Sequence, residues 1–250
     1  MGFQTNIIFC TSLNQKILND YGKQTLDSML ENISPTYKIS LFSEDNLNLN
    51  IPEIDFYNLF EFRADYEKFV VKHQKNPRIN NNNVKQYKKE YVKFSFKVFS
   101  MCAASRIYSN YDFLIWIDSD IFIKKIIDKN IINYLCDKGN FASYLNRENV
   151  QGTTLWNKDH TETGLISFNL NHKIKNNFFY NFENIYLNEI IFKLIAWDDT
   201  SVFDFIKDEY EKKLDIKFRK LTDGTSRNPI NDHLMLRDYF FHPLGNKKVY

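Results

Sequence analysis

Two aspartates separated by one serine are the clearest candidates for chemistry in this sequence. Asp118, Ser119 and Asp120 directly follow five apolar residues, Phe113 to Ile117, and this apolar run predicts a buried strand. Ligands of open α/β sheets bind at the carboxyl ends of the strands. Two carboxylates held there can share one hard cation, whereas burying them together without a cation is costly. The alternative is a solvated acidic turn.

The same stretch of sequence resembles a known motif. Residues 111–120 read Y-D-F-L-I-W-I-D-S-D, which is similar to the D-x-D segment of the GT-A glycosyltransferases. In that superfamily the motif holds Mn²⁺ or Mg²⁺, which bridges the diphosphate of a nucleotide-sugar and acts as a Lewis acid. The resemblance implies that Asp118 and Asp120 are metal ligands. It also implies that Asp118 and Ser119 contact the donor, most simply a UDP-sugar.

The C-terminal tail carries a second resemblance. His242, Gly245 and Lys248 form H-x-x-G-x-x-K, which is similar to the C-terminal motif of retaining family-eight-like enzymes. This implies that His242 is a third metal ligand, that Gly245 allows close backbone approach, and that Lys248 contacts the diphosphate. Those enzymes follow the lysine with Pro-Trp, whereas this chain has Val249-Tyr250. The alternative for His242 is a partly buried tail histidine.

Two acidic segments extend the resemblance to bacterial and phage glycosyltransferases. Residues 162–169 read E-T-G-L-I-S-F-N, and residues 197–204 read W-D-D-T-S-V-F-D. In related enzymes the first segment lines the sugar and acceptor pocket, and the second places a carboxylate near the anomeric carbon. The resemblance implies catalytic or sugar-binding roles for Asp199, Glu162 and Asp198. The alternative for the aspartate pair is capping of a helix N-terminus.

Four further residues are weaker candidates for the donor site. Lys97 lies on a predicted helix before the D-x-D strand, and Arg147 follows a predicted strand. Thr11 and Ser12 end the first predicted strand, where GT-A enzymes contact the nucleoside. The alternatives are a solvated lysine and a simple helix N-cap.

The elements that must position these residues follow from the alternation of apolar runs and amphipathic stretches. This alternation predicts an α/β fold with a mostly parallel, mixed central sheet flanked by helices. With the resemblance, we expect one GT-A (Rossmann-like) domain over residues 1–250. Residues 46–58 and the tail beyond residue 221 carry no regular pattern. Expected strands are 5–10, 37–42, 113–117, 141–145, 165–170 and 217–221, and expected helices are 15–30, 63–73, 84–108, 126–135, 176–194 and 200–214.

Composition excludes several other classes of protein. The 250 residues are 43% hydrophobic with a net charge of +2, which argues against disorder and against a dedicated nucleic-acid binder. Three cysteines without C-x-x-C spacing suit a reducing compartment. We find no signal peptide and no apolar run long enough to span a bilayer. We therefore expect a cytoplasmic protein (in the host cytoplasm if viral) without stable membrane insertion, and the oligomeric state stays open.

These observations favour a metal-dependent hexosyltransferase that uses a nucleotide-sugar, with retention implied by the tail motif. The acceptor stays open between a glycan, a lipid-linked sugar, a protein and a modified base in DNA. We expect residues 46–83 and 147–163 to recognise the acceptor, and Trp156, Trp197 and Tyr144 to lie at the sugar site. The alternatives are a haloacid-dehalogenase-like Mg²⁺-dependent phosphatase, a non-catalytic sugar- or nucleotide-binding module, and a nucleotidyltransferase.

Overall fold

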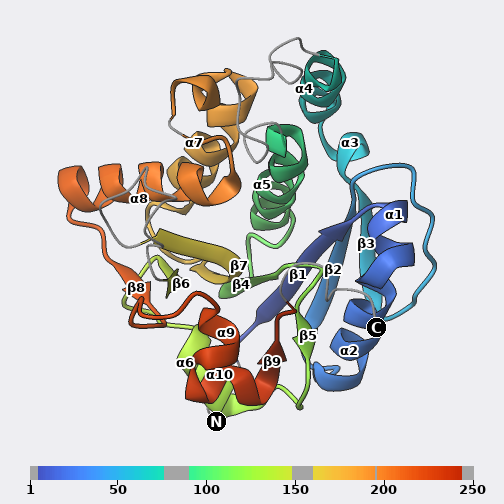
Figure 1. Ribbon diagram of the computed structural model, residues 1–250, viewed down its shortest axis with the longest axis vertical. Coiled ribbons are helices and arrows are strands. Elements are labelled where there is room, and N and C mark those ends of the chain that lie inside the picture. Colours follow the sequence, from blue (N-terminus) through green and yellow to red (C-terminus); the bar gives the residue numbers. More distant parts are fainter. Residues whose placement is uncertain (1–4, 76–89, 148–159, 195, 244–250) are drawn as a thin grey trace.

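The computed structural model describes residues 5–75, 90–147, 160–194 and 196–243, and its centre is a seven-stranded sheet (Figure 1). The strand order is β3-β2-β1-β4-β7-β6-β8. All neighbouring strands are parallel except β7, which runs antiparallel to both β4 and β6. The strands are β1 (Ile7–Leu13), β2 (Lys38–Ser43), β3 (Ile54–Asn58), β4 (Phe113–Ile117), β6 (Ala142–Arg147), β7 (His160–Asn169) and β8 (Phe218–Lys220). The predicted mostly parallel, mixed α/β sheet is confirmed.

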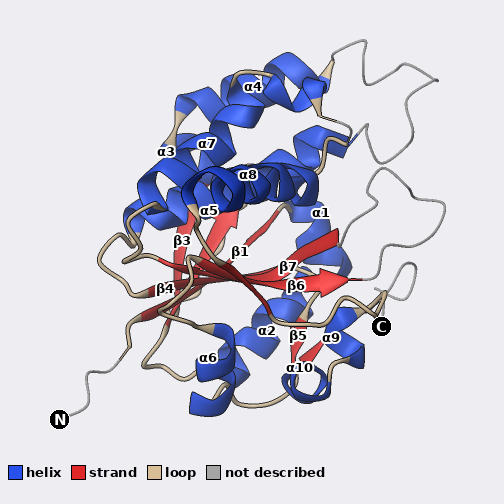
Figure 2. Ribbon diagram, turned by 90° about the vertical axis from the view of Figure 1, so that its left-hand side faces the viewer, coloured by secondary structure: helices blue, strands red, loops and turns tan. Residues whose placement is uncertain are grey.

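Helices cover both faces of this sheet (Figure 2). One face carries α3 (Leu59–Phe62), α4 (Ala64–Gln74), α5 (Tyr91–Ile107), α7 (Lys175–Leu187) and α8 (Asp199–Leu214), and the other carries α2 (Lys23–Asn32), α6 (Lys129–Leu135), α9 (Pro229–Asp232) and α10 (Leu234–Tyr239). The central strands β1 and β4 are therefore buried along their whole length. This burial explains their continuous apolar sequences.

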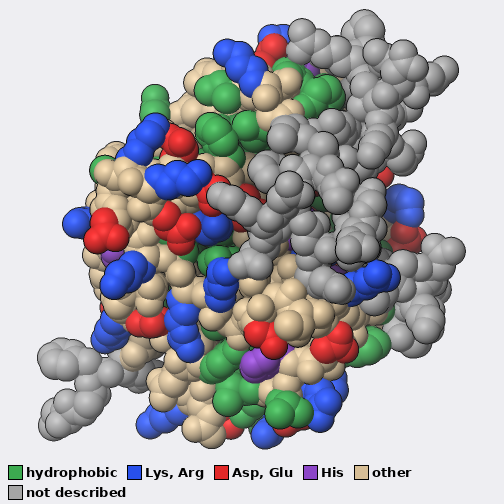
Figure 3. Space-filling view, turned by 60° about the vertical axis from the view of Figure 1, so that its left-hand side comes forward, with side chains coloured by type: hydrophobic (Ala, Val, Ile, Leu, Met, Phe, Trp, Pro, Cys, Tyr) green, Lys and Arg blue, Asp and Glu red, His purple; other side chains and the backbone are tan. Residues whose placement is uncertain are grey.

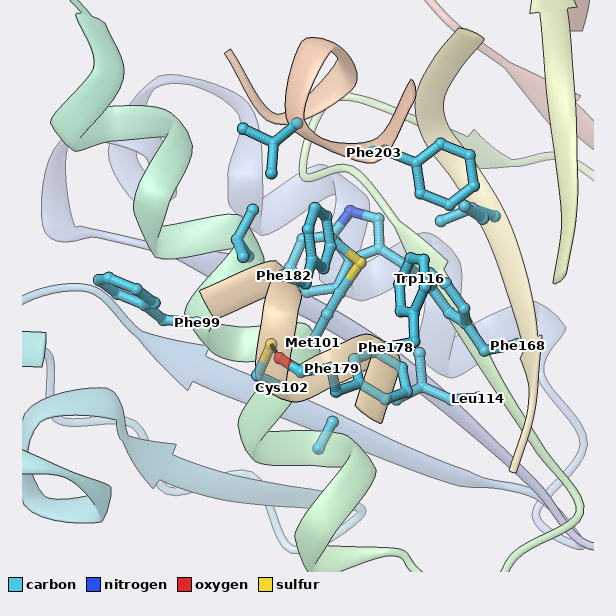
Figure 4. Packing of buried hydrophobic residues seen from close by; sticks show 14 of the residues in the cluster. Phe99, Met101, Cys102, Leu114, Trp116, Phe168, Phe178, Phe179, Phe182 and Phe203 are labelled. Atoms are coloured by element: carbon cyan, nitrogen blue, oxygen red, sulfur yellow. Dashed lines mark hydrogen bonds between the residues drawn. The ribbon is translucent and has the colours of Figure 1, made fainter. Parts of the chain in front are cut away.

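The excess of aromatic residues is mostly core. Figure 4 shows Phe178, Phe179, Phe182 and Phe203 packed with Trp116 between α5, α7, α8 and the sheet. Ring centroids in this cluster lie within 4.7–6.4 Å of one another, the range of tilted and edge-to-face pairs.

One aromatic residue expected at a sugar site belongs to this core instead. Tyr144 keeps only 2% of its surface exposed and packs on Phe203, so its predicted sugar contact is wrong. Trp197 is partly buried and packs edge-on against Tyr91 and Phe192, at centroid distances of 5.7 and 4.9 Å. Its sugar contact stays a prediction. Trp156 lies outside the described residues.

The structure differs from the expected elements in four further places. The expected helix over residues 15–30 is divided into α1 (Gln15–Ile17), a π-helical turn (Leu18–Gly22) and α2. Residues 46–58 include the edge strand β3, and a 3₁₀ turn (Ile190–Lys193) follows α7. The tail forms α9, α10 and the strand β9 (Phe240–Phe241), which pairs antiparallel with β5 (Phe122–Ile123).

The molecular surface agrees with the near-neutral composition. On the face shown in Figure 3, Lys and Arg side chains are interspersed with Asp and Glu side chains. All three cysteines are free, and Cys10 and Cys102 are buried. Within the described ranges no helix is long and apolar enough to cross a membrane.

Candidate active site

A cavity of about 380 Å³ opens at the carboxyl ends of β1, β2 and β4. Residues predicted from separate parts of the sequence meet in its wall. The predicted site residues that line it are Ser12, Lys97, Asp118, Ser119, Asp120, Arg147, Glu162, Asp198 and Asp199.

At the centre of the cavity wall, one ammonium group lies between two carboxylates. Lys97, from the buried face of α5, places its Nζ 2.8 Å from Asp118 Oδ1 and 2.9 Å from Asp199 Oδ2. It also donates a hydrogen bond to Thr163 Oγ1 at 3.1 Å. Lys97 is only 9% exposed, so it is not the solvated helix lysine that was the alternative. Lys97 lies beside the D-x-D segment, and its contact with the donor stays a prediction.

Burial and neighbouring charges oppose each other at this ion pair. Burial lowers the pKa of Lys97, but Asp118 and Asp199 raise it by more, so the group stays a cation. Burial raises the pKa of Asp118, with further increases from Asp120 and Asp199, while Lys97 opposes them. Positive charge near Asp118 therefore favours its carboxylate form.

A bulge in β7 places small residues against Asp118. The β6–β7 pairing skips from Tyr144 opposite Ile166 to Leu145 opposite Glu162, which leaves residues 163–165 of β7 without partners on β6. The freed Gly164 accepts a hydrogen bond from the Asp118 backbone N–H at 2.8 Å. A Cβ atom on Gly164 would lie 3.3 Å from Asp118 Oδ2 and 3.3 Å from Glu162 Oε1. Glycine at this position therefore lets both carboxylates approach the strand.

The C-terminal tail returns to the D-x-D segment. Pairing of β5 with β9 sets Phe122 opposite Phe241, and His242 follows directly. His242 Nε2 lies 3.5 Å from Asp120 Oδ1. Asn231 fixes the His242 backbone by accepting its N–H at 3.0 Å and donating to its carbonyl at 2.8 Å. Burial lowers the pKa of His242, but Asp120, with Glu162 and Asp118, raises it above its usual value overall.

The side chains of Asp118, Asp120 and His242 are of the types that bind divalent cations. Within the described ranges no group of three or more His, Cys, Asp or Glu side chains is arranged so that it could hold a metal ion. Asp120 and His242 nevertheless face each other at ligand-like spacing. Asp118 Oδ1 accepts hydrogen bonds from Trp116 Nε1 at 2.6 Å and from Lys97, so Oδ2 is its oxygen for a cation. Such a partial set fits Mg²⁺ or Mn²⁺, which take their remaining ligands from water and substrate phosphates.

Two residues beside the D-x-D segment form an ion pair in the cavity wall. Arg147, the last residue of β6, donates through Nη1 to Glu162 Oε2 at 2.6 Å. Glu162 Oε1 accepts the backbone N–H of Gly164 at 3.2 Å. Both predicted residues therefore lie at the site, with the arginine orienting the glutamate.

The N-terminus of α8 supplies the two remaining predicted acids. Asp198 is the N-cap and accepts the Ser201 backbone N–H at 2.7 Å, which confirms the capping alternative. Asp198 also lines the cavity, so capping does not remove it from the site. Burial and the neighbouring Asp199 raise the pKa of Asp198. Asp199 accepts the Thr163 hydroxyl at 2.5 Å in addition to its pairing with Lys97.

The end of the first strand contributes one of its two predicted contacts. Ser12 lines the cavity and donates its hydroxyl to Glu44 Oε1 at 2.7 Å, and Asn14 Nδ2 donates to Glu44 Oε2 at 3.0 Å. Thr11 is fully buried and is not part of the cavity wall. Its predicted donor contact is corrected accordingly, because alternation along β1 turns it to the other face of the sheet.

Sequence reasoning missed several residues that line the cavity. Glu44 follows β2, and burial raises its pKa from 4.5 to about 7 against the opposing hydrogen bonds from Ser12 and Asn14. Its only sequence signal was an acid directly after an apolar strand. Lys93 and Phe94 precede Lys97 on α5, and His160 begins β7. Gly245 and Lys248 of the tail motif lie outside the described residues.

The sheet order, the antiparallel β7 and the acidic segment after β4 define a GT-A fold, the α/β fold of nucleotide-sugar glycosyltransferases. The chain is similar over 98% of its length to the solved apo structure of WbbM, a bifunctional glycosyltransferase. The TM-score is 0.58 and the sequences are 13% identical. The chain spans 47% of that protein, about half of its length. No protein-family model matches the sequence, and no curated protein matches it.

Proposed function

We propose that this protein is a metal-dependent glycosyltransferase that moves a hexosyl group from a nucleoside-diphosphate sugar, a UDP-sugar in the first instance, to a hydroxyl acceptor. The observation that carries the proposal is the convergence of Asp118, Asp120, Asp199 and Glu162 in the wall of one cavity of a GT-A fold, with His242 3.5 Å from Asp120. These residues come from four distant parts of the chain. We assign this activity to one domain over residues 1–250.

Asp118 through Oδ2, Asp120 and His242 would hold Mn²⁺ or Mg²⁺. When bound, the cation neutralises charge on the departing nucleoside diphosphate. Lys97 supplies a fixed positive charge beside these ligands, and Lys248 and Gly245 of the tail would contact the diphosphate. Ser119 and Ser12 would contact the nucleotide, and Arg147 would orient Glu162 toward the sugar.

Asp199 and Glu162 would position the sugar hydroxyls, with Asp198 beside them. A buried carboxylate next to the anomeric carbon also stabilises an oxocarbenium-like centre. We propose retention of anomeric configuration, with the leaving phosphate oxygen accepting the proton of the attacking hydroxyl. No protein base is then required. The support for retention is the resemblance of the tail motif.

The phosphatase alternative is disfavoured by the fold. Its mechanism would need Asp118 as the nucleophile. The chain is instead similar over 98% of its length to a glycosyltransferase structure, and Asp118 Oδ1 is bonded to Trp116 and Lys97.

Release of nucleoside diphosphate tests the proposed activity. Nucleotide-sugars incubated with the protein and Mn²⁺ should break down slowly to free sugar and nucleoside diphosphate, with water as acceptor. Chelation of the metal should stop the release. Hydrolysis of an aryl phosphate without breakdown of any nucleotide-sugar would favour the phosphatase instead, and metal-dependent binding without turnover would favour a binding module.

A further inference from the structure

His160 is a cavity residue to which the proposed function gives no task. It is the first residue of β7, and because β7 runs antiparallel to β4, its beginning reaches the carboxyl edge of the sheet. In the β6–β7 pairing it lies opposite Arg147. Its side chain lines the cavity and keeps 23% of its surface exposed.

A fixed carboxylate lies behind the imidazole ring. His160 Nδ1 is buried and lies 3.8 Å from Asp204 Oδ2, one turn into α8 from the site aspartates. Thr161 donates its hydroxyl to Asp204 Oδ1 and its backbone N–H to Oδ2 at 3.3 Å. Lys207 Nζ lies 3.9 Å from Asp204 Oδ1. These contacts hold the carboxylate in place, so it can orient the ring.

This arrangement decides what the ring offers to a ligand. A carboxylate facing Nδ1 favours the tautomer with its proton on that nitrogen. In the neutral ring Nε2 is then a hydrogen-bond acceptor without a proton. Such an atom takes a hydroxyl donor and cannot donate to a phosphate.

The position along the sheet edge points to the acceptor. Glu44 and Ser12 lie at the ends of β2 and β1, the D-x-D segment follows β4, and His160 and Arg147 lie beyond it on β7 and β6. With the nucleotide at β1 and the metal at β4, the far side remains for the acceptor. The wall is also rich in carboxylates, which disfavours a polyanion. The acidic residues that line the cavity are Glu44, Asp118, Asp120, Glu162, Asp198 and Asp199, against Lys93, Lys97 and Arg147.

We propose that His160, oriented by Asp204, binds the acceptor through Nε2 and accepts a hydrogen bond from a hydroxyl adjacent to the one that is glycosylated. The acceptor class is therefore an uncharged compound with neighbouring hydroxyls, such as a sugar. This inference rests on the proposed glycosyltransferase function and names the substrate side of the same site. Asp204 is a positioning residue in this account.

A competition between simple acceptors tests the inference without knowledge of the natural acceptor. The protein, Mn²⁺ and a labelled nucleotide-sugar that it hydrolyses are incubated with glycerol, which has neighbouring hydroxyls, or with methanol, which has one. The products are free sugar, glyceryl glycoside and methyl glycoside. The wild type should favour glycerol over methanol, and His160→Ala should lower that preference roughly three- to tenfold, the effect of one lost hydrogen bond. Hydrolysis to free sugar in the same reactions is the reference against which both transfers are expressed.

Further variants separate binding from a merely structural role. His160→Gln keeps a polar group near the Nε2 position and should restore part of the preference. Asp204→Asn should lose part of it. His172→Ala, at the other end of β7, is the matched control and should behave as the wild type.

Two results would overturn the inference. The first is a wild type without any preference for glycerol. That result would favour an acceptor with a single hydroxyl, such as a hydroxymethylated base. The second is an equal fall of hydrolysis and both transfers in His160→Ala, which would mean a structural role. Failure of the proposed function is distinguishable, because the wild type would then break down no nucleotide-sugar at all.

Discussion

At the scale of single residues, the cavity depends on one ammonium group shared by two carboxylates. Lys97 is within 2.9 Å of both Asp118 and Asp199, and all three side chains are largely removed from solvent. Lys97→Met keeps the volume but leaves the carboxylates without their cation. We expect a loss of about 3–5 kcal/mol in the free energy of unfolding, measured by urea titration. Lys93→Met, an exposed lysine one turn earlier on α5, should cost less than about 1 kcal/mol. Equal losses for the two variants would contradict this account.

Glu44 gives the stability of the protein a specific pH dependence. Its pKa in the fold is about 7, raised from 4.5 by burial. Because the folded pKa is the higher one, its stabilising contribution is complete below pH 4.5 and is lost as the pH rises through 7. Glu44→Gln should therefore be more stable than the wild type at pH 8, by on the order of 3 kcal/mol at most, and similar to it at pH 4. Urea unfolding of both proteins across this range is the measurement, and parallel pH profiles would disprove the assignment.

At the scale of elements, the β7 bulge and the returning tail bring the ligands together. Gly164 lies in the bulge, where an added Cβ would also come within 3.2 Å of Ile121 Cδ1. Gly164→Ala should cost about 1–3 kcal/mol through overpacking. Donor hydrolysis should fall at least tenfold, because Asp118 and Glu162 must shift. Circular dichroism and nucleoside-diphosphate release check the two effects, with Gly139→Ala in an exposed turn as control. Retained activity in Gly164→Ala would show that this close approach is unimportant.

Asn231 allows a separate test of the position of His242 in the tail. This residue holds the His242 backbone by two hydrogen bonds and contacts no proposed ligand side chain that is described. Asn231→Ala should weaken Mn²⁺ binding several-fold, because His242 loses its fixed position. Electron paramagnetic resonance of free Mn²⁺ measures the affinity, and Asn171→Ala on the far side of the sheet is the matched control. Unchanged affinity in Asn231→Ala would remove His242 from the ligand set.

At the scale of the whole molecule, the parts that could be predicted from sequence are those with a local signal. The continuous apolar run of β4 made both the strand and the acidic segment after it predictable. Edge strand β3 was missed because it has only five residues and lies within the longer polar segment 46–58, so its apolar residues form no run. The direction of β7 leaves no trace in a hydrophobic pattern. His160 and Glu44 could not be predicted as cavity residues, because they come together only when strands that are far apart in the sequence pair in the sheet.

The cavity residues fall into two groups on opposite sides of β4, which we propose to be the donor side and the acceptor side. Ser12 and Glu44 lie on the β1–β2 side of the cavity, and Arg147 and His160 lie on the β6–β7 side. The proposed metal ligands lie between them. Under the proposed function, nucleotide, metal and acceptor would lie in that order along one sheet edge, and the site would then need residues from almost the whole chain.

The central claim is that Asp118, Asp120 and His242 bind a nucleotide-sugar through a divalent cation. The most direct measurement is the melting temperature of the wild type and of Asp120→Asn with a UDP-sugar, in Mn²⁺ and in chelator. A ligand at one hundred times its dissociation constant stabilises the folded state by about 2.7 kcal/mol, which is readily detected as a shift in melting temperature. We predict this shift for the wild type in Mn²⁺ alone, and none for Asp120→Asn. An equal shift in chelator, or in Asp120→Asn, would contradict the claim.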